Sequence, residues 1–342
     1  MSDAIFGHEA EAHEFLSAMR GDRPHHGWLF VGPEGVGKAM AALAFARRAL
    51  AESSGVPVPG EGWAVPEEHP TARYMAGHAH PDFYLLERLP RDEKLQGKLR
   101  NEWPDNPEMA RSIKVDQVRA LTARFATKPS LSERRMVVID AADDLEAPSA
   151  NALLKVLEEP PQGTIFILIS HAPGRLLPTI RSRCRVLRFA PLGDVAMAQA
   201  LRAALPEATA EEIETLVRSG AGAPGQALQF AGLGLGDLTR QIEMLTSAGD
   251  PGLALRSALA QALAGKAAQE KYEAFLTLVP AHLAALARIA DPLRLPAIIS
   301  AWEKARDLCQ MAIPGSYDAY MIVMELGSLL ASLAPERRHA KA

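Results

Sequence analysis

The feature that most constrains the fold of this 342-residue chain is a glycine-rich loop that lies between an apolar run and a helix-forming run. The loop reads Gly32-Pro33-Glu34-Gly35-Val36-Gly37-Lys38-Ala39, after apolar residues 28–31 and before an Ala-rich segment, 38–50. Strand, glycine loop and helix in this order are typical of a P-loop, whose backbone N–H groups and lysine hold phosphate. We therefore predict a phosphate cradle made by Gly32, Gly35, Gly37 and Lys38, with an accidental glycine turn as the alternative.

Two positions near this cradle lack the side chains that nucleotide hydrolysis needs. A Ser or Thr normally follows the P-loop lysine and binds Mg²⁺, but Ala39 stands there. The apolar run 136–140 ends in Asp140, which fits the acid that orients the water of the metal; a helix-capping or loop carboxylate is the alternative. A working ATPase of the AAA+ type usually carries Glu next, where this chain has Ala141. Loss of such a base costs about 10²-fold or more, so we expect little or no ATPase activity.

Composition narrows the class of protein. With 48% apolar and 23% charged residues, the chain is expected to fold into two or three globular domains. A net charge of −4 argues against a surface that binds nucleic acid everywhere. Its two cysteines, Cys184 and Cys309, form no disulfide framework and fit a reducing cytoplasm. Neither a signal peptide at the start nor an apolar run of about 18 residues is present, so we expect a soluble cytoplasmic protein that avoids membranes.

The order of the expected elements predicts an α/β fold with a doubly wound parallel sheet, because strands alternate with helices up to residue 191. Asp116 is expected to cap a helix that runs to about residue 125. Two polar stretches, about 52–80 and 88–112, are expected to be inserted loops. The expected strands are 28–31, 83–86, 136–140, 164–170 and 185–189, and the expected helices are 9–20, 38–50, 116–125, 148–159 and 178–181.

Beyond Pro191 every apolar pattern is helical, which predicts separate all-α domains. We place a core domain at 1–191, a small helical domain at 192–236, a second helical domain at 237–336 and a frayed tail at 337–342. The glycines at 232, 234 and 236 mark the link between the two helical domains.

Several charged and polar residues allow two interpretations, a solvated side chain or a binding role. His69, His78 and His80 lie in the first polar stretch; we expect solvated side chains, with metal binding as the alternative. The second stretch mixes acids, including Asp92 and Glu93, with six basic residues; we expect a solvated hairpin, with binding of DNA phosphates or an acidic partner as the alternative. The six are Arg88, Arg91, Lys94, Lys98, Arg100 and Arg111. Asp143 and Asp144 are expected to be exposed loop acids.

The segments 148–161 (PSANALLKVLEEPP) and 180–184 (IRSRC) closely resemble the clamp-loader branch of the AAA+ P-loop proteins. Phe6-Gly7-His8, His80-Pro81-Asp82 and the run 113–119 are similar to the bacterial delta-prime subunits of DNA polymerase III. The resemblance covers about residues 5–230, and the remaining residues fit only through their helical character.

This resemblance implies a core followed by a helical lid and a C-terminal collar domain, in a hetero-pentamer with gamma/tau-type ATPase subunits and a delta subunit. It implies a non-motor stator that helps to load the sliding clamp onto primer–template DNA. Arg183 would then be an arginine finger that reaches the ATP of a neighbouring subunit; residue type alone leaves a self-paired surface arginine as the alternative. Polymerase chemistry would lie in another subunit of the holoenzyme.

The departures from the motor subunits agree with a stator. Ser170 holds the first sensor position, and Gly225 or Gln226 replaces the second sensor arginine. The stretch 52–80 has no cysteine, so the four-cysteine zinc module of many relatives cannot form. We expect no required cofactor and no metal, with weak ATP or ADP binding without normal Mg²⁺ coordination left open. The alternatives are an ATP-hydrolysing motor subunit and an autonomous DNA-binding module, against which the acidic net charge argues.

Overall fold

The computed structural model describes residues 5–21, 24–96, 98, 102–104, 107–312 and 317–335, so the predicted tail, 337–342, lies outside the described residues. The chain divides into two compact units. The first runs through Ala204 and also includes Gly222–Gly225; the second comprises Leu205–Ala221 and the residues from Gln226 onward. The finer division into core, lid and collar stays a prediction.

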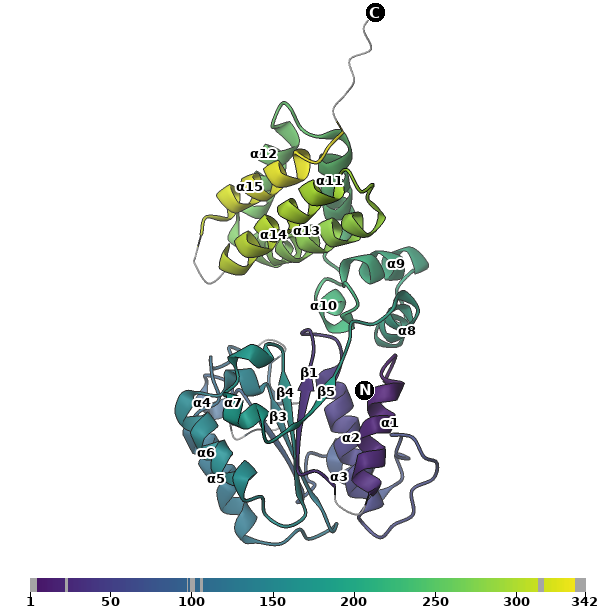
Figure 1. Ribbon diagram of the computed structural model, residues 1–342, viewed down its shortest axis with the longest axis vertical. Coiled ribbons are helices and arrows are strands. Elements are labelled where there is room, and N and C mark those ends of the chain that lie inside the picture. Colours follow the sequence, from purple (N-terminus) through teal and green to yellow (C-terminus); the bar gives the residue numbers. More distant parts are fainter. Residues whose placement is uncertain are drawn as a thin grey trace, which may run out of the picture. The chain divides into compact units, whose positions relative to one another are not determined.

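In the first unit, five parallel strands of the described chain form one sheet in the order β2-β3-β4-β1-β5 (Figure 1). Its register pairs Phe30 with Ile169 and, on the other side of β1, with Leu187. The predicted parallel sheet is confirmed, and because β1 lies between β4 and β5, the glycine loop leaves from an inner strand. The strands are β1 (Gly27–Val31), β2 (Phe83–Glu87), β3 (Arg135–Asp140), β4 (Thr164–Ser170) and β5 (Arg185–Arg188).

Helices cover both faces of this sheet, as a doubly wound fold requires. On one face, α1 (Glu9–Arg20) and α2 (Lys38–Glu52) pack Phe15 and Phe45 against Trp28 and Phe30. On the other face, the second core cluster draws on α5 (Val115–Ala123), α6 (Ala147–Glu158) and α7 (Pro178–Arg181). The buried strands are continuous apolar runs because both of their faces lie in a core.

The first insertion is better ordered than its sequence predicts. It contains the helix α3 (Pro70–Ala76), which His69 caps by accepting a hydrogen bond from the Thr71 N–H. His69 and His80 are buried, so the prediction of solvated side chains is wrong for both, whereas His78 is exposed. Burial lowers the pKa of His80, whose Nδ1 accepts from the backbone of Asp82. No group of three or more metal-ligating side chains occurs among the residues described here.

Arg48 of α2 holds the loop that precedes α3. Its buried guanidinium donates to the carbonyl oxygens of Pro59 and Ala64 at 3.1 and 2.8 Å, and to that of Gly60. It also pairs with Glu52 at 2.7 Å. The Arg48 side chain therefore orders this loop by binding its carbonyl oxygens.

The second insertion contains one short described helix, α4 (Glu93–Gln96), and an antiparallel bridge between Pro90 and Met109. Arg91 forms an ion pair with Glu108 across this bridge, which agrees with a hairpin. Arg100 lies outside the described residues. Asp116 lies in the first turn of α5 instead of capping it, since Lys114 holds the cap position.

The remaining helices confirm the helical character predicted beyond Pro191. In the second unit, Asp250 accepts a hydrogen bond from Arg256 Nε at 3.1 Å, and Arg256 also donates to Ser328 at 2.8 Å. This link joins α12 to α15. The helices are α8 (Asp194–Ala204), α9 (Ala210–Ser219), α10 (Pro224–Gln229), α11 (Leu235–Ala248), α12 (Ala254–Leu263), α13 (Gln269–Ile289), α14 (Leu295–Ala312) and α15 (Ala319–Ala331).

Within the described ranges, no helix combines the length and the apolar character that crossing a membrane would require.

Candidate phosphate-binding site and arginine finger

The glycine loop connects β1 directly to α2, the geometry predicted for a P-loop. Gly35 and Gly37 have φ angles of 76° and 110°, which residues with a Cβ rarely adopt. Lys38 is the first residue of α2, so its side chain and the N-terminal N–H groups of the helix lie at the same end. The predicted residues Gly32, Gly35, Gly37 and Lys38 thus form one continuous turn at the carboxyl end of β1.

Lys38 makes its polar contacts with the loop itself. Its Nζ donates to the carbonyl oxygens of Gly32 and Pro33 at 2.7 and 2.6 Å, and the residue is only 3% exposed. Burial lowers the pKa of Lys38 to about 8, although the nearby carboxylates of Asp140, Glu34 and Asp143 favour its charged form. A phosphate that entered the cradle would compete with two carbonyl oxygens for this ammonium group.

Asp143 engages the Ser170 hydroxyl that the sequence assigned to the first sensor. Ser170 Oγ donates to Asp143 Oδ1 at 2.8 Å, and the His171 N–H donates to Oδ2 at 2.5 Å. Both contacts join the loop after β3 to the end of β4. Ser170 is fully buried and its hydroxyl hydrogen is used in this bond, so sequence reasoning missed the partner that holds it.

The loop after β3 contains the other predicted residues. Asp140 ends β3, as predicted, and the following Ala141 is 5% exposed. Asp144 pairs with Arg88 at 3.1 Å, and burial raises the pKa of Asp144 even though Arg88 opposes the rise. The prediction that Asp143 and Asp144 are exposed loop acids is wrong, because each is partly buried and bonded to another segment.

Two segments distant in sequence brace the glycine loop. The backbone of Gly225, at the position expected to replace a sensor arginine, donates to the Gly35 carbonyl oxygen. On the N-terminal side, Nε2 of the buried His8 lies 3.0 Å from the Val36 carbonyl oxygen, and its ring packs edge-on against Phe189. These contacts hold the turn without any ionic group from the 222–225 segment.

Arg183 lies just beyond α7 and is 34% exposed through its side chain. Its Nη2 pairs with Glu158 Oε1 at 2.7 Å, and its Nη1 donates to the Thr179 carbonyl oxygen at 2.9 Å. The flanking residues Ile180 and Cys184 are buried, and burial raises the pKa of the Cys184 thiol to about 12. The guanidinium therefore stands at the surface on an anchored turn, held by its own chain and still in contact with solvent.

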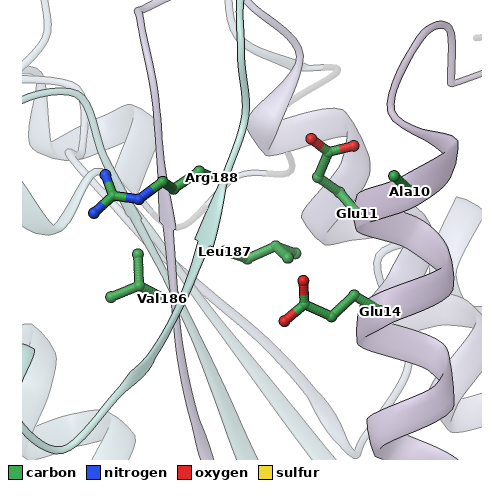
Figure 2. Close-up of a pocket in the computed structure, with 6 residues that line it drawn as sticks. All are labelled: Ala10, Glu11, Glu14, Val186, Leu187 and Arg188. Carbon is green, nitrogen blue, oxygen red and sulfur yellow. The ribbon is translucent and has the colours of Figure 1, made fainter.

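A shallow pocket of about 270 Å³ lies elsewhere in the first unit, between α1 and β5. Figure 2 shows Leu187 directed toward α1, whereas Val186 and Arg188 point to the opposite side of the strand. Glu14 pairs with Arg185 at 2.7 Å at this place. None of the predicted site residues lines the pocket, whose lining is Ala10, Glu11, Glu14, Val186, Leu187 and Arg188.

Comparison with known proteins decides the family. A family model described as DNA polymerase III, delta subunit, matches residues 7–193, more than half of the chain. This chain belongs to that family. The match covers the sheet, the glycine loop and the turn that presents Arg183, and it supports the resemblance predicted from the sequence.

Curated relatives of the chain are also named as subunits of DNA polymerase III. It is 35% identical over 228 residues to DNA polymerase III subunit delta' of Pseudomonas aeruginosa, covering 66% of this chain and 62% of the relative. It is 34% identical over 177 residues to delta' of Bacillus subtilis, covering 52% and 45%. A gamma/tau subunit of Mycobacterium tuberculosis is 30% identical over 66% of this chain and 35% of the relative. The chain thus spans less than two thirds of the length of each of these proteins.

Solved structures show lower sequence similarity. A gamma subunit-related protein of DNA polymerase III from Thermotoga maritima is 14% identical with a TM-score of 0.43, covering 94% of this chain and 99% of that one. A RuvB variant from Thermotoga maritima is 13% identical with a TM-score of 0.41, covering 76% and 77%.

Proposed function

We propose that this chain is a delta-prime stator of a bacterial DNA polymerase III clamp loader. It would act in the cytoplasm as part of a hetero-pentamer that also contains gamma/tau-type ATPase subunits and a delta subunit. This complex would load the sliding clamp onto primed DNA. The delta-prime names of its relatives support this assignment, and so does the residue pattern at the glycine loop. The supporting pattern is a phosphate cradle with Ala39 and Ala141 where a motor has its metal and base residues.

The single observation that carries the stator assignment is that Ala39 and Ala141 stand where a motor subunit has its metal-binding hydroxyl and its general base. The polar side chains beside these two positions already contact their own chain. Lys38 binds the carbonyl oxygens of Gly32 and Pro33, and Ser170 binds Asp143. Weak ATP or ADP binding would have to break the lysine contacts, and hydrolysis would still lack a base. The chain would require neither a nucleotide nor zinc for its role.

In this function Arg183 supplies chemistry to a neighbour. Charge accumulates on the phosphoryl oxygens during transfer, and an arginine placed against them is worth about 10³–10⁵ in rate. Arg183 lies on a turn fixed by buried Ile180 and Cys184, so its guanidinium starts from a defined place at the surface. It would donate to the γ-phosphate of the ATP held by the adjoining ATPase subunit.

Reconstitution with gamma/tau-type and delta subunits tests the proposal. The chain alone should show negligible ATPase, and the complex should load the clamp only when the chain is present. Arg183→Ala should leave assembly intact and slow the DNA-stimulated ATPase of the assembled complex. Arg119→Ala is the matched control, because Arg119 is 71% exposed on the same unit and pairs only with Asp116 among the contacts described. Motor-rate ATPase by the isolated chain would refute the stator assignment, and an unchanged rate for Arg183→Ala would refute the finger.

A further inference from the structure

We propose that Glu158 is a positioning residue that holds the Arg183 guanidinium on its own subunit until the phosphate of a neighbouring nucleoside triphosphate replaces it. This inference rests on the proposed role of Arg183 and adds a residue for which the sequence predicts no role. The carboxylate lies 2.7 Å from Arg183 Nη2 and is the only acid that the described structure pairs with this arginine.

The contact joins two elements that are separated in the sequence by the whole of β4. Glu158 is the last residue of α6, whereas Arg183 follows the short helix α7. Thr179 supplies the second anchor from α7 through its carbonyl oxygen, at 2.9 Å from Nη1. Since Ser182 and Arg183 donate their backbone N–H groups to Pro178 and Ile180, the base of the side chain is fixed as well. The remaining freedom lies in the guanidinium, whose position depends on which acceptor holds it.

The position of Glu158 indicates that its carboxylate stabilises the Arg183 guanidinium and does not stabilise its own helix. An acid at the C-terminus of a helix faces the negative end of the helix dipole, where a cation is favoured. Glu158 and Glu159 both stand at this unfavourable end of α6. The guanidinium of Arg183 offsets the repulsion at Glu158, while the side chain of Glu159 has no ion pair or hydrogen bond in the described part of the chain.

The exposure of the pair makes the exchange feasible. The side chains of Arg183 and Glu158 are 34% and 49% exposed, so solvent weakens their attraction and a phosphate can reach the guanidinium. A guanidinium offers five N–H donors, and phosphate oxygens accept charge-assisted hydrogen bonds from it. While the Glu158 carboxylate is paired with the guanidinium, its negative charge offsets the positive charge that Arg183 presents to the neighbouring subunit. After the exchange, the same carboxylate lies near the incoming phosphate and repels it.

Glu158→Gln removes the charge and keeps the size of the side chain, so it tests this competition. In the reconstituted complex, we expect the KM for ATP of DNA-stimulated hydrolysis to fall by about two- to five-fold, the range for losing an exposed ion pair, with kcat unchanged. Glu159→Gln is the matched control, since it makes the same charge change at the same helix end; its KM should equal that of the unchanged chain. Thermal unfolding of both variants confirms that each is folded.

A double-mutant cycle separates this inference from the proposed function. In the Arg183→Ala background, Glu158→Gln should no longer shift KM. If Arg183→Ala itself leaves the ATPase unchanged, the finger role fails and the positioning role fails with it. If Arg183→Ala lowers the rate but Glu158→Gln matches Glu159→Gln, or raises KM, the finger stands and the positioning role of Glu158 is overturned.

Discussion

The backbone N–H of Gly225 donates a hydrogen bond to the carbonyl oxygen of Gly35 across 2.8 Å. A Cβ added at Gly225 would lie 2.9 Å from the Cα of Gly35 and 3.0 Å from its oxygen, both of them backbone atoms. The approach is therefore open only to glycine. It fixes the tip of the phosphate loop from a segment that lies far along the chain, beyond the whole sheet.

Gly225→Ala should destabilise the first unit, because rigid backbone atoms have to move to admit the methyl group. We expect a loss of about 1–3 kcal/mol in the free energy of unfolding, as for other overpacked sites, measured by denaturant titration. Gly174→Ala is the control, since nothing lies within 4 Å of a Cβ at Gly174. Equal stabilities of the two variants would show that the loop yields to the added methyl without cost.

The pKa of Lys38 gives the stability of the unit a pH dependence at alkaline pH. Burial lowers this pKa from 10.5 to about 8, so between these values the unfolded chain holds a proton that the folded chain has released. Stability should therefore rise with pH from about 8 and level off near 10.5. The difference in unfolding free energy between the unchanged chain and Lys38→Met, measured across this range, should show the rise. A difference that stays constant with pH would contradict it.

The Arg48 guanidinium should govern the order of the loop at residues 53–66. Arg48→Ala removes the guanidinium that donates to the carbonyl oxygens of Pro59, Gly60 and Ala64. These oxygens must then accept hydrogen bonds from water instead. We expect rapid cleavage in this loop during limited proteolysis and a loss of about 1–3 kcal/mol in stability. The control is Arg73→Ala, a change at an exposed arginine of α3. A chelator should alter neither protein, and protection of the loop in Arg48→Ala would count against this role.

Asp250 should make the second unit sensitive to acid. Burial by itself raises the pKa of this carboxyl group, but hydrogen bonds from the backbone and side chain of Arg256 outweigh it and leave the pKa below its usual value. A depressed pKa means that the stabilisation is complete above the usual Asp range and is lost as pH falls through the lowered value. The stability difference between the unchanged chain and Asp250→Asn should shrink accordingly on acidification. Asp237→Asn, at an 82% exposed site on α11, should show no such change.

Local patterns predicted the sheet and the strand–loop–helix arrangement at Lys38 well, because each depends on short runs of sequence. The strand at 164–170 was predicted to the residue, and the loop at Lys38 followed from its glycines and flanking elements. These features need only neighbouring residues to be recognised. The same holds for the turn at Arg183, where a resemblance added the expected role.

Contacts between distant segments could not be predicted in the same way. The pairs Ser170–Asp143 and Arg183–Glu158 join residues that share no local pattern. The sequence around one residue of each pair therefore does not predict its partner. Burial of His69 was missed for a related reason: its polar surroundings in sequence predict solvent, but its capping role in α3 places it inside. Tertiary packing decides such positions, and local composition does not.

The burial of Ala141 determines what a glutamate at that position would cost. A glutamate at that position would carry its charge into a place where the present residue is 5% exposed, and burying an unpaired carboxylate is costly. Ala39→Thr and Ala141→Glu together would therefore complete the motif in sequence while straining the fold behind it. A glutamate at position 141 would therefore need either a partner for its charge or a rearranged loop after β3.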